Sequence, residues 1–327
     1  MISSAQFNDL VKNALVQWRE GREEFPSVRS QYVITKSVSE ATSEHSEMSQ
    51  LPTAKRRHEG GKALQGNFKQ GYSKNFKQSE IGLQVDITKQ MKMFDKYGLI
   101  YSRMRNAGKS TERRVELDLA SLLSYAFTSS YTNIDGETVA TTNPAGNPLI
   151  YLTQSCNGSS STYSNQLATT NSAFDQTILE KLEELFNGFL DESDGRLLPV
   201  VPDSIITGRH APTKHSVRRV LESEFYTENA NNTKNTVNNY QHVVVPFIDL
   251  NCQTEARDSN KYKFCFVAAL NSSDNKFLLE ESQPIRLEAP DAWNETSTSS
   301  FLSTALYDFG SLGSNFIAGT KGDGSAV

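Results

Sequence analysis

The spacing of apolar residues predicts one long helix in the first half of the chain. Over residues 99–127, apolar side chains recur at steps of three and four, which places them on one stripe of an α-helix. The stripe consists of Val115, Leu119, Leu122, Leu123, Ala126 and Phe127. Arg113 and Arg114 fall off the stripe, where we expect exposed ion pairs. Gly108 predicts a bend, or a break into two helices nearby.

Three other segments have helical spacing. Residues 4–20 carry an apolar stripe that we expect to end at Gly21, and residues 172–190 carry a second stripe with Ser172 as its N-cap. Residues 203–223 predict a helix with an irregular start. A short terminal helix cannot bury its stripe alone, so the first one is expected to dock either on its own domain or on a neighbouring copy.

Other segments have the pattern of β-strands. Residues 81–88 alternate strictly between apolar and polar, which predicts a half-buried strand before the long helix. The apolar runs 242–250 and 261–270 predict buried strands, and residues 197–201 predict a strand closed by Pro202. Shorter β-like runs lie at 31–35, 285–287 and 301–309. The Ser-, Thr- and Asn-rich stretch after residue 127 predicts loops and short strands, so the fold class is mixed, α+β.

A basic, glycine-rich segment precedes the first clear strand. Residues 51–80 contain seven Lys or Arg against two Glu, together with four glycines. Phe68, Tyr72 and Phe76 recur every four residues among lysines, a pattern that could bind single-stranded nucleic acid. The glycines and the polar alternation favour the other interpretation, a projecting two-stranded hairpin whose charges pair with an acidic neighbour.

The composition argues against a compact enzyme and against a membrane protein. The 327 residues are 37% hydrophobic with a mean hydropathy of −0.51, which is low for a compact enzyme and indicates polar arms or burial completed by neighbouring copies. No apolar run reaches the roughly 18 residues of a membrane span. The net charge of −5 gives no overall attraction to nucleic acid. Cys156, Cys252 and Cys265 form no CxxC pair, which is typical of a reducing compartment.

Motifs for catalysis or cofactor binding do not emerge from the sequence. Residues 106–110 resemble the end of a phosphate loop, but Arg103 stands where the earlier glycine belongs. His58-Glu59 has no second histidine at metalloprotease spacing, and His210 and His215 are five apart across a proline. We therefore expect no catalytic residue, metal ligand or cofactor, and a protein that is not an enzyme. A site assembled from distant loops stays open.

The order of the elements resembles the major capsid (major head) protein of tailed bacteriophages, the family with the Hong Kong ninety-seven fold, nearest its Mu-like head-subunit branch. SEIGLQVDITKQMKMFDKYGLI (79–100) is similar to the strand that returns from the family's E-loop into its spine helix. DGRLLPVVPDSIITGRHAPTKHSVRRVLES (194–223) is similar to the A-domain step from a strand through a Pro-flanked turn to a helix. HVVVPFIDL (242–250) resembles the next strand, and WNETSTSSFLSTALYDFGSLGSNFIAGT (293–320) resembles the closing strand.

This resemblance implies a division of the chain and a function. The expected parts are an N-terminal arm (1–50), an extended E-loop hairpin (51–87), a P domain with a long spine helix (88–130), a mixed α/β A domain (131–260), and returning P-domain strands with a C-terminal tail (261–327). The implied function is structural: copies form the hexamers and pentamers of an icosahedral head enclosing double-stranded DNA. The arm and the E-loop would reach over neighbouring subunits.

Candidate inter-subunit residues and partners follow from the same resemblance. The residues are Lys55, Arg56, Arg57, Lys62, Lys69, Lys74, Lys77, Phe7, Leu10, Leu15 and Trp18. Because the chain starts directly at the arm helix, a separate scaffolding protein is expected, with a portal and, as a further candidate, a decoration or cement protein. The location would be the virion, assembled in the host bacterial cytoplasm without a membrane. The alternative function is a nucleic-acid-binding protein that uses residues 55–77.

Overall fold

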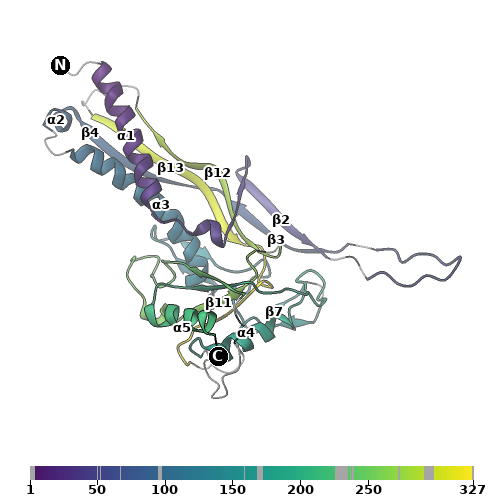
Figure 1. Cartoon of the computed structure of the whole chain (residues 1–327). Helices are drawn as coiled ribbons and strands as arrows, with labels where there is room; N and C mark the ends of the chain where they lie inside the picture. The colour runs from purple at the N-terminus through teal and green to yellow at the C-terminus, as the bar shows by residue number, and fades with distance from the viewer. Residues whose placement is uncertain are drawn as a thin grey trace.

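The computed structural model describes residues 4–325, except 50, 52, 67, 95–97, 158, 168–171, 225–234, 236, 238, 272 and 291–297; of residues 4–6 it describes the backbone alone. Figure 1 shows an elongated upper part, a lower lobe and a long hairpin that projects sideways. The upper part and the lower lobe each contain one four-stranded sheet.

The sheet of the upper part, the long sheet, carries the strand predicted over 81–88. Its order is β1 (Ile34–Ser37), β12 (Phe277–Glu288), β13 (Thr298–Ser311) and β4 (Ser79–Thr88). β13 pairs antiparallel with β12 and β4, whereas β1 pairs parallel with β12. Ile87 is buried, Ile81 and Val85 pack partly buried against the core, and Leu83 remains exposed. The predicted alternation is therefore present, with one side of β4 only partly covered.

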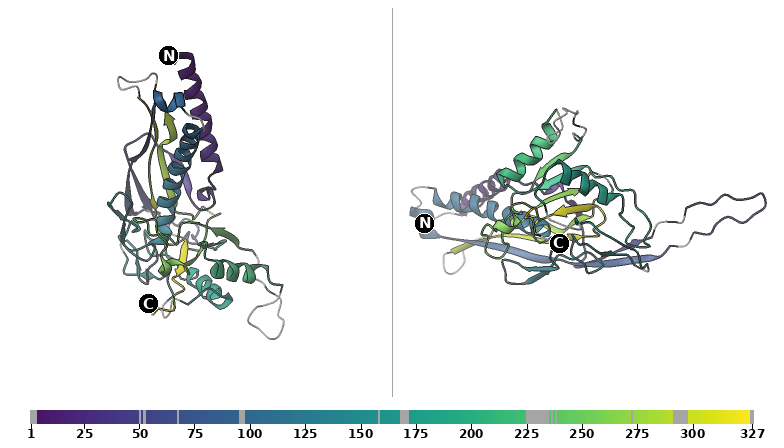
Figure 2. Two further views of the ribbon diagram at one scale, coloured as in Figure 1. Left: turned by 90° about the vertical axis from the view of Figure 1, so that its left-hand side faces the viewer. Right: turned by 90° about the horizontal axis from the view of Figure 1, so that it is seen from below.

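Helices α1 (Ser4–Glu24) and α3 (Leu99–Ser124) lie together along this sheet, as Figures 1 and 2 show. A short helix, α2 (Lys89–Phe94), leads from β4 toward α3. On α1, Phe7, Leu10 and Trp18 are buried within the chain, and the Trp18 indole N–H donates to Ser303 Oγ on β13 at 3.0 Å. Of the two docking alternatives for this helix, the structure has the first: it packs on its own subunit.

Two glycines allow α1 and α3 to cross in close contact. A Cβ added at Gly108 would lie 2.2 Å from the Trp18 carbonyl oxygen, and one added at Gly21 would lie 2.1 Å from the Arg105 carbonyl oxygen. Any side chain at either position would push the helices apart. The prediction of a bend or break at Gly108 is wrong, because α3 is continuous and the glycine serves packing. Gly21 likewise lies inside α1 instead of ending it.

The second half of α3 is buried almost all round. The predicted stripe is in the core, but Glu112, Glu116 and Asp118 are buried as well. Arg113 forms the expected exposed ion pair, with Glu255. The expectation is wrong for Arg114, whose half-buried guanidinium donates to Asp118 at 2.9 Å and to Asp135 at 2.6 Å.

The sheet of the lower lobe combines strands from distant parts of the chain. Its order is β10 (Gln241–Val244), β9 (Ser204–Thr207), β11 (Cys265–Ala268) and β14 (Ile317–Thr320). One face packs against α4 (Gln176–Phe186) and α5 (Ala211–Glu222), and the residues of the other face join the core of α3. The expected strand over 197–201 is wrong, since the strand follows Pro202 as β9. The helix predicted over 203–223 therefore begins only at Ala211. Asp175, not Ser172, caps α4 by accepting from the Ile178 N–H at 2.7 Å.

Short elements complete the fold. Two small hairpins, β5 (Ser130–Thr132) with β6 (Thr138–Ala140) and β7 (Gln154–Ser155) with β8 (Thr162–Tyr163), confirm the short strands expected after residue 127. The 3-10 turns η1 (Arg29–Gln31) and η2 (Ser259–Lys261) lie in loops. The division of the chain differs from the expected one, because β1 of the arm belongs to the long sheet and β11 and β14 of the last segment belong to the lower sheet.

Candidate functional site

The most unusual surface of the molecule is the projecting hairpin. Strand β2 (Thr42–Met48) pairs antiparallel with β3 (Gln70–Lys77), and the Ser49 N–H donates to the Lys69 carbonyl at 2.9 Å beyond the last strand residue. From there the chain runs outward and back as a long extended loop, far from either sheet (Figures 1 and 2), with no strand among its described residues. The hairpin thus begins earlier than the predicted boundary at residue 51.

The outer part of the hairpin combines positive charge with apolar groups. Lys55, Arg56, Arg57, Lys62 and Lys69 are exposed, and none forms an ion pair with another described residue. The apolar residues Met48, Leu51, Leu64 and Phe68 are also exposed, Met48 by 69% and Phe68 by 63%. These exposed apolar side chains are not covered by any described part of their own chain. Exposed apolar surface of this kind marks a site of interaction.

The root of the hairpin, by contrast, is fixed to the long sheet. On β2, the Ser43 hydroxyl and the His45 ring both contact the fully buried carboxylate of Glu280 on β12. On β3, the Lys77 N–H donates to Asp308 Oδ2 at 2.7 Å. These contacts set the direction in which the outer part leaves the subunit.

Lys74 is the strongest polar anchor of the root. Its ammonium donates to the Thr142 carbonyl at 2.9 Å and to the Ser311 carbonyl at 3.2 Å, and it lies 5.8 Å from the centre of the Phe76 ring. Burial lowers the pKa of this ammonium to about 8, and the Coulomb attraction of Asp308 opposes the shift. The side chain is therefore bound by its own subunit, and its expected contact with a neighbouring copy stays a prediction.

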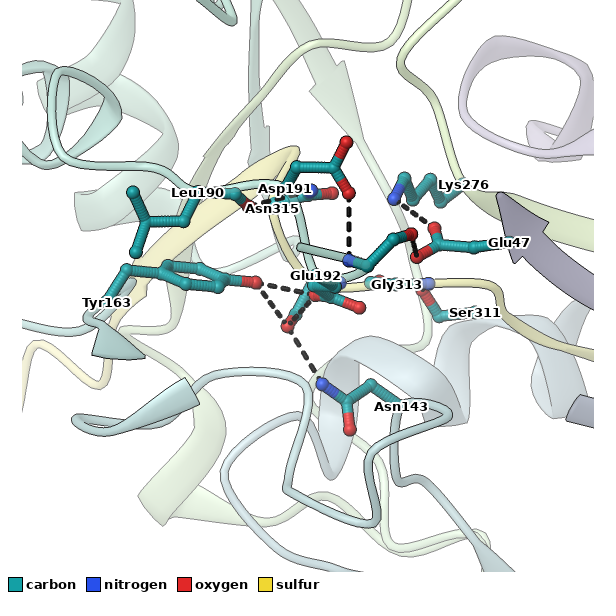
Figure 3. Close-up of polar contacts among 12 residues, drawn as sticks. Glu47, Asn143, Tyr163, Leu190, Asp191, Glu192, Lys276, Ser311, Gly313 and Asn315 are labelled. Atoms are coloured by element: carbon teal, nitrogen blue, oxygen red, sulfur yellow. Dashed lines mark hydrogen bonds and ion pairs between the residues drawn. The ribbon is translucent and has the colours of Figure 1, made fainter. Parts of the chain in front are cut away.

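A second anchor joins β2 to the lower lobe (Figure 3). Lys276 forms an ion pair with Glu47 of β2, and the Ser193 hydroxyl donates to the same carboxylate at 3.5 Å. The neighbouring Glu192 is fully buried and accepts from the Tyr163 hydroxyl at 2.6 Å and from the Ser314 N–H at 2.7 Å. Burial raises the pKa of Glu47, Lys276 lowers it, and the charge of Glu192 adds to the rise.

The structure separates the two sets of predicted contact residues. The exposed cations, Lys77 included, lie along the hairpin, whereas Phe7, Leu10 and Trp18 are buried on α1 and Leu15 is partly buried there. Phe7, Leu10 and Trp18 pack inside their own subunit, and a contact of these residues with a neighbouring copy stays a prediction. The sequence did not predict the root carboxylates Glu47, Glu280 and Asp308 as anchors of the hairpin. The one feature that could have indicated them is an acidic residue within a strand.

A groove of about 520 Å³ lies between α3, β4 and the β5–β6 hairpin, and several of the ionisable groups that line it bind one another. The Tyr307 hydroxyl donates to Asp118 at 2.6 Å, and Arg114 binds Asp118 and Asp135. Burial raises the pKa of Asp118, and Arg114 partly offsets the rise. These polar contacts join α3, β13 and the β5–β6 hairpin, so they stabilise the fold.

Further candidate chemistry is limited. Cys156, Cys252 and Cys265 are buried free thiols, and burial raises the pKa of the first two to about 11. Within the described ranges, His, Cys, Asp and Glu residues form no group of three that could hold a metal ion. No helix among the described residues is long and apolar enough to cross a membrane.

Comparison with known proteins rests on structure alone. No protein-family model and no curated protein sequence matches the chain. Among solved structures, the capsid of Ralstonia phage GP4 matches with a TM-score of 0.56 at 9% identity, over 88% of this chain and 87% of that one. The capsid structure of the Cyanophage P-SCSP1u matches with a TM-score of 0.52 at 12% identity, over 90% and 88%. The chain therefore has the α+β fold of phage capsid proteins, the Hong Kong ninety-seven fold, as the order of its elements predicted.

Proposed function

We propose that this chain is a major capsid protein, whose copies assemble into the pentamers and hexamers of an icosahedral head that encloses double-stranded DNA. The observation that supports the proposal is the hairpin, which has a fixed root and an outer part that the described residues of its own chain leave uncovered. The similar fold of two phage capsids supports it.

The physical argument concerns what the outer hairpin would gain from a neighbour. The outer part has no strand pairing among its described residues, and it exposes apolar side chains such as Phe68 and Leu51. Docking on a second copy would bury these groups. The chain carries a net charge of −5, so a basic hairpin meeting another subunit is electrostatically complementary, which selects register and partner.

The finer assignments belong to the same proposal. The chain would be a structural protein of the virion, not an enzyme, of the Mu-like head-subunit branch. Its assembly in the bacterial cytoplasm would use a separate scaffolding protein, with a portal and a decoration or cement protein as further partners. The enclosed DNA would not be bound specifically.

The experiment replaces the three consecutive cations Lys55, Arg56 and Arg57 with glutamine. A matched control replaces Lys12, Arg19 and Arg103, which are exposed on α1 and α3, with the same loss of charge. Sedimentation at low salt should show wild type and control assembling, and both should dissociate as the salt concentration is raised. The hairpin variant should stay in small species even at low salt, with an unchanged melting temperature.

Two results would count against the proposal. Assembly of the hairpin variant at wild-type concentration and salt would mean that the hairpin cations do not hold copies together. If that variant assembled normally but lost a salt-dependent affinity for single-stranded DNA, the basic segment would instead be a nucleic-acid-binding element.

A further inference from the structure

Two helices of the lower lobe carry opposite charge on their outward faces. Helices α4 and α5 pack their apolar residues into one core cluster on the same face of the lower sheet. Both lie in the lower lobe in Figures 1 and 2. The outward side of α4 bears three carboxylates, of Glu180, Glu183 and Glu184, and one cation, Lys181. The outward side of α5, with the residue two before it, bears Lys214, Arg218, Arg219 and Arg209.

The positive face is not neutralised by the described part of the chain. None of its four cations forms an ion pair there; Arg219 donates only to the Ser216 hydroxyl, at 3.5 Å. Helix α5 itself has one carboxylate, Glu222, at its C-terminal end. The positive charges also act on a neighbouring histidine. Burial lowers the pKa of His242 on β10 to about 4, and the charges of Arg218 and Lys214 add to the shift.

The negative face is a groove with an apolar side. About 390 Å³ of space is lined by the three glutamates of α4, by Val200, Val201 and Pro202, and by Tyr240, whose hydroxyl donates to Glu183 at 2.6 Å. Val201 is 76% exposed. Carboxylates beside exposed apolar groups suit arginine and lysine, which bury an aliphatic stem while the charged head pairs with an acid.

We propose that α5 of one subunit docks against the α4 groove of the next subunit, so that copies join head to tail through their lower lobes. The inference rests on the proposed function and names the surface through which the rings close. The two faces differ, so the contact is heterologous, and repetition of it closes a ring when the rotation fits. A second copy fits better than nucleic acid, because the carboxylates on the same lobe would repel phosphates.

The experiment uses charge reversal on both faces, in the full chain. Glu184→Arg and Arg218→Glu should each raise the concentration needed for ring formation tenfold or more, and the double variant should recover it. Glu23→Arg and Arg19→Glu, at exposed sites of α1, are controls with the same charge changes. Native mass spectrometry and circular dichroism would report ring size and folding.

A mixture of the two single variants gives a sharper test. Each contact then joins one copy of each variant, so the two variants alternate around the ring. Rings should therefore form with even numbers of subunits only. Normal rings from both single variants, or no recovery in the double variant, would overturn the inference while the capsid function stands. If Arg218→Glu instead abolished only binding to a DNA oligonucleotide, α5 would face nucleic acid. Failure of the wild type to form rings or shells would contradict the proposed function itself.

Discussion

At the scale of residues, the charged side chains of α3 are stable in the core because each has a partner far away in the sequence. Glu112 binds Arg22 and Arg29, and Glu116 accepts the Val28 and Arg29 N–H groups at 3.2 Å. A helical pattern shows which residues share a face, but not what another element brings to that face. The sequence therefore predicted the stripe of α3 and missed the burial of its carboxylates.

Leu119 and Arg114 should both matter for the stability of the subunit. Leu119→Ala removes a fully buried side chain, at a cost of about 2–5 kcal/mol. Arg114→Ala leaves the buried carboxylate of Asp118 without its cation, at a cost of about 3 kcal/mol. Arg113→Ala breaks an exposed pair, worth about 1 kcal/mol or less, and a contact of the guanidinium with the Phe247 ring at 6.0 Å. Urea unfolding of the unassembled subunit measures all three; equal effects of Arg113→Ala and Arg114→Ala would contradict the assignment.

The buried ammonium of Lys74 predicts a pH dependence. Its pKa of about 8 lies below the roughly 10.4 of an unfolded lysine, so between these values the unfolded chain binds more protons. From about pH 8 to about pH 9.5 the contribution of Lys74 to the free energy of unfolding should therefore rise, by about 2 kcal/mol. The buried thiols Cys156, Cys252 and Cys265 oppose this rise, because burial raises their pKa and the unfolded thiols lose their protons in the same range. The slope that belongs to Lys74 is therefore the difference between the wild type and a variant without its ammonium. Lys261, with a pKa also lowered to about 8 by burial, adds a slope of the same sign.

Unfolding midpoints over this pH range would test the role of Lys74. Lys74→Met should lose its share of the slope, and the exposed neighbour Lys77→Met should keep the full slope. The range stops below pH 10, because burial raises the pKa of Tyr131 and Tyr307 and their slope has the opposite sign. A wild-type slope retained in Lys74→Met would show that its ammonium is not buried.

At the scale of elements, type and order could be predicted from the sequence, but pairing could not. Alternation in 81–88 and the stripe of α3 are local patterns, and the structure confirms both. The pairing of β1 with β12 joins segments more than 240 residues apart and leaves no periodic signal. The same holds for the hairpin: its glycines and charges predicted the projection, whereas its anchors on Glu280 and Asp308 come from distant strands.

The α1–α3 crossing gives a direct test of close packing between elements. Gly108→Ala should raise intrinsic helix propensity by about 1 kcal/mol and yet destabilise the subunit, because the new Cβ meets the Trp18 carbonyl. We expect a net loss of about 1–3 kcal/mol, measured by thermal unfolding. Ser110→Ala, at an exposed site on the same helix, should be neutral or stabilising. A stabilising Gly108→Ala would mean that the helices are not in contact there.

At the scale of the whole molecule, the low hydropathy of −0.51 has a structural reason. An elongated part with a partly covered sheet and a long exposed hairpin buries fewer apolar groups per residue than a compact enzyme. The two sheets also share the last third of the chain, so the upper part and the lower lobe are expected to unfold together. Under the proposed function, such a subunit would complete its burial among its copies.

Electron microscopy of the purified full-length protein, with its mass distribution measured at the same concentration, tests this account most directly. We predict closed shells, or rings of five and six subunits, that dissociate into folded subunits when the salt concentration is raised. A single monomeric species at every concentration and salt, with no ring or shell in the images, would contradict the account.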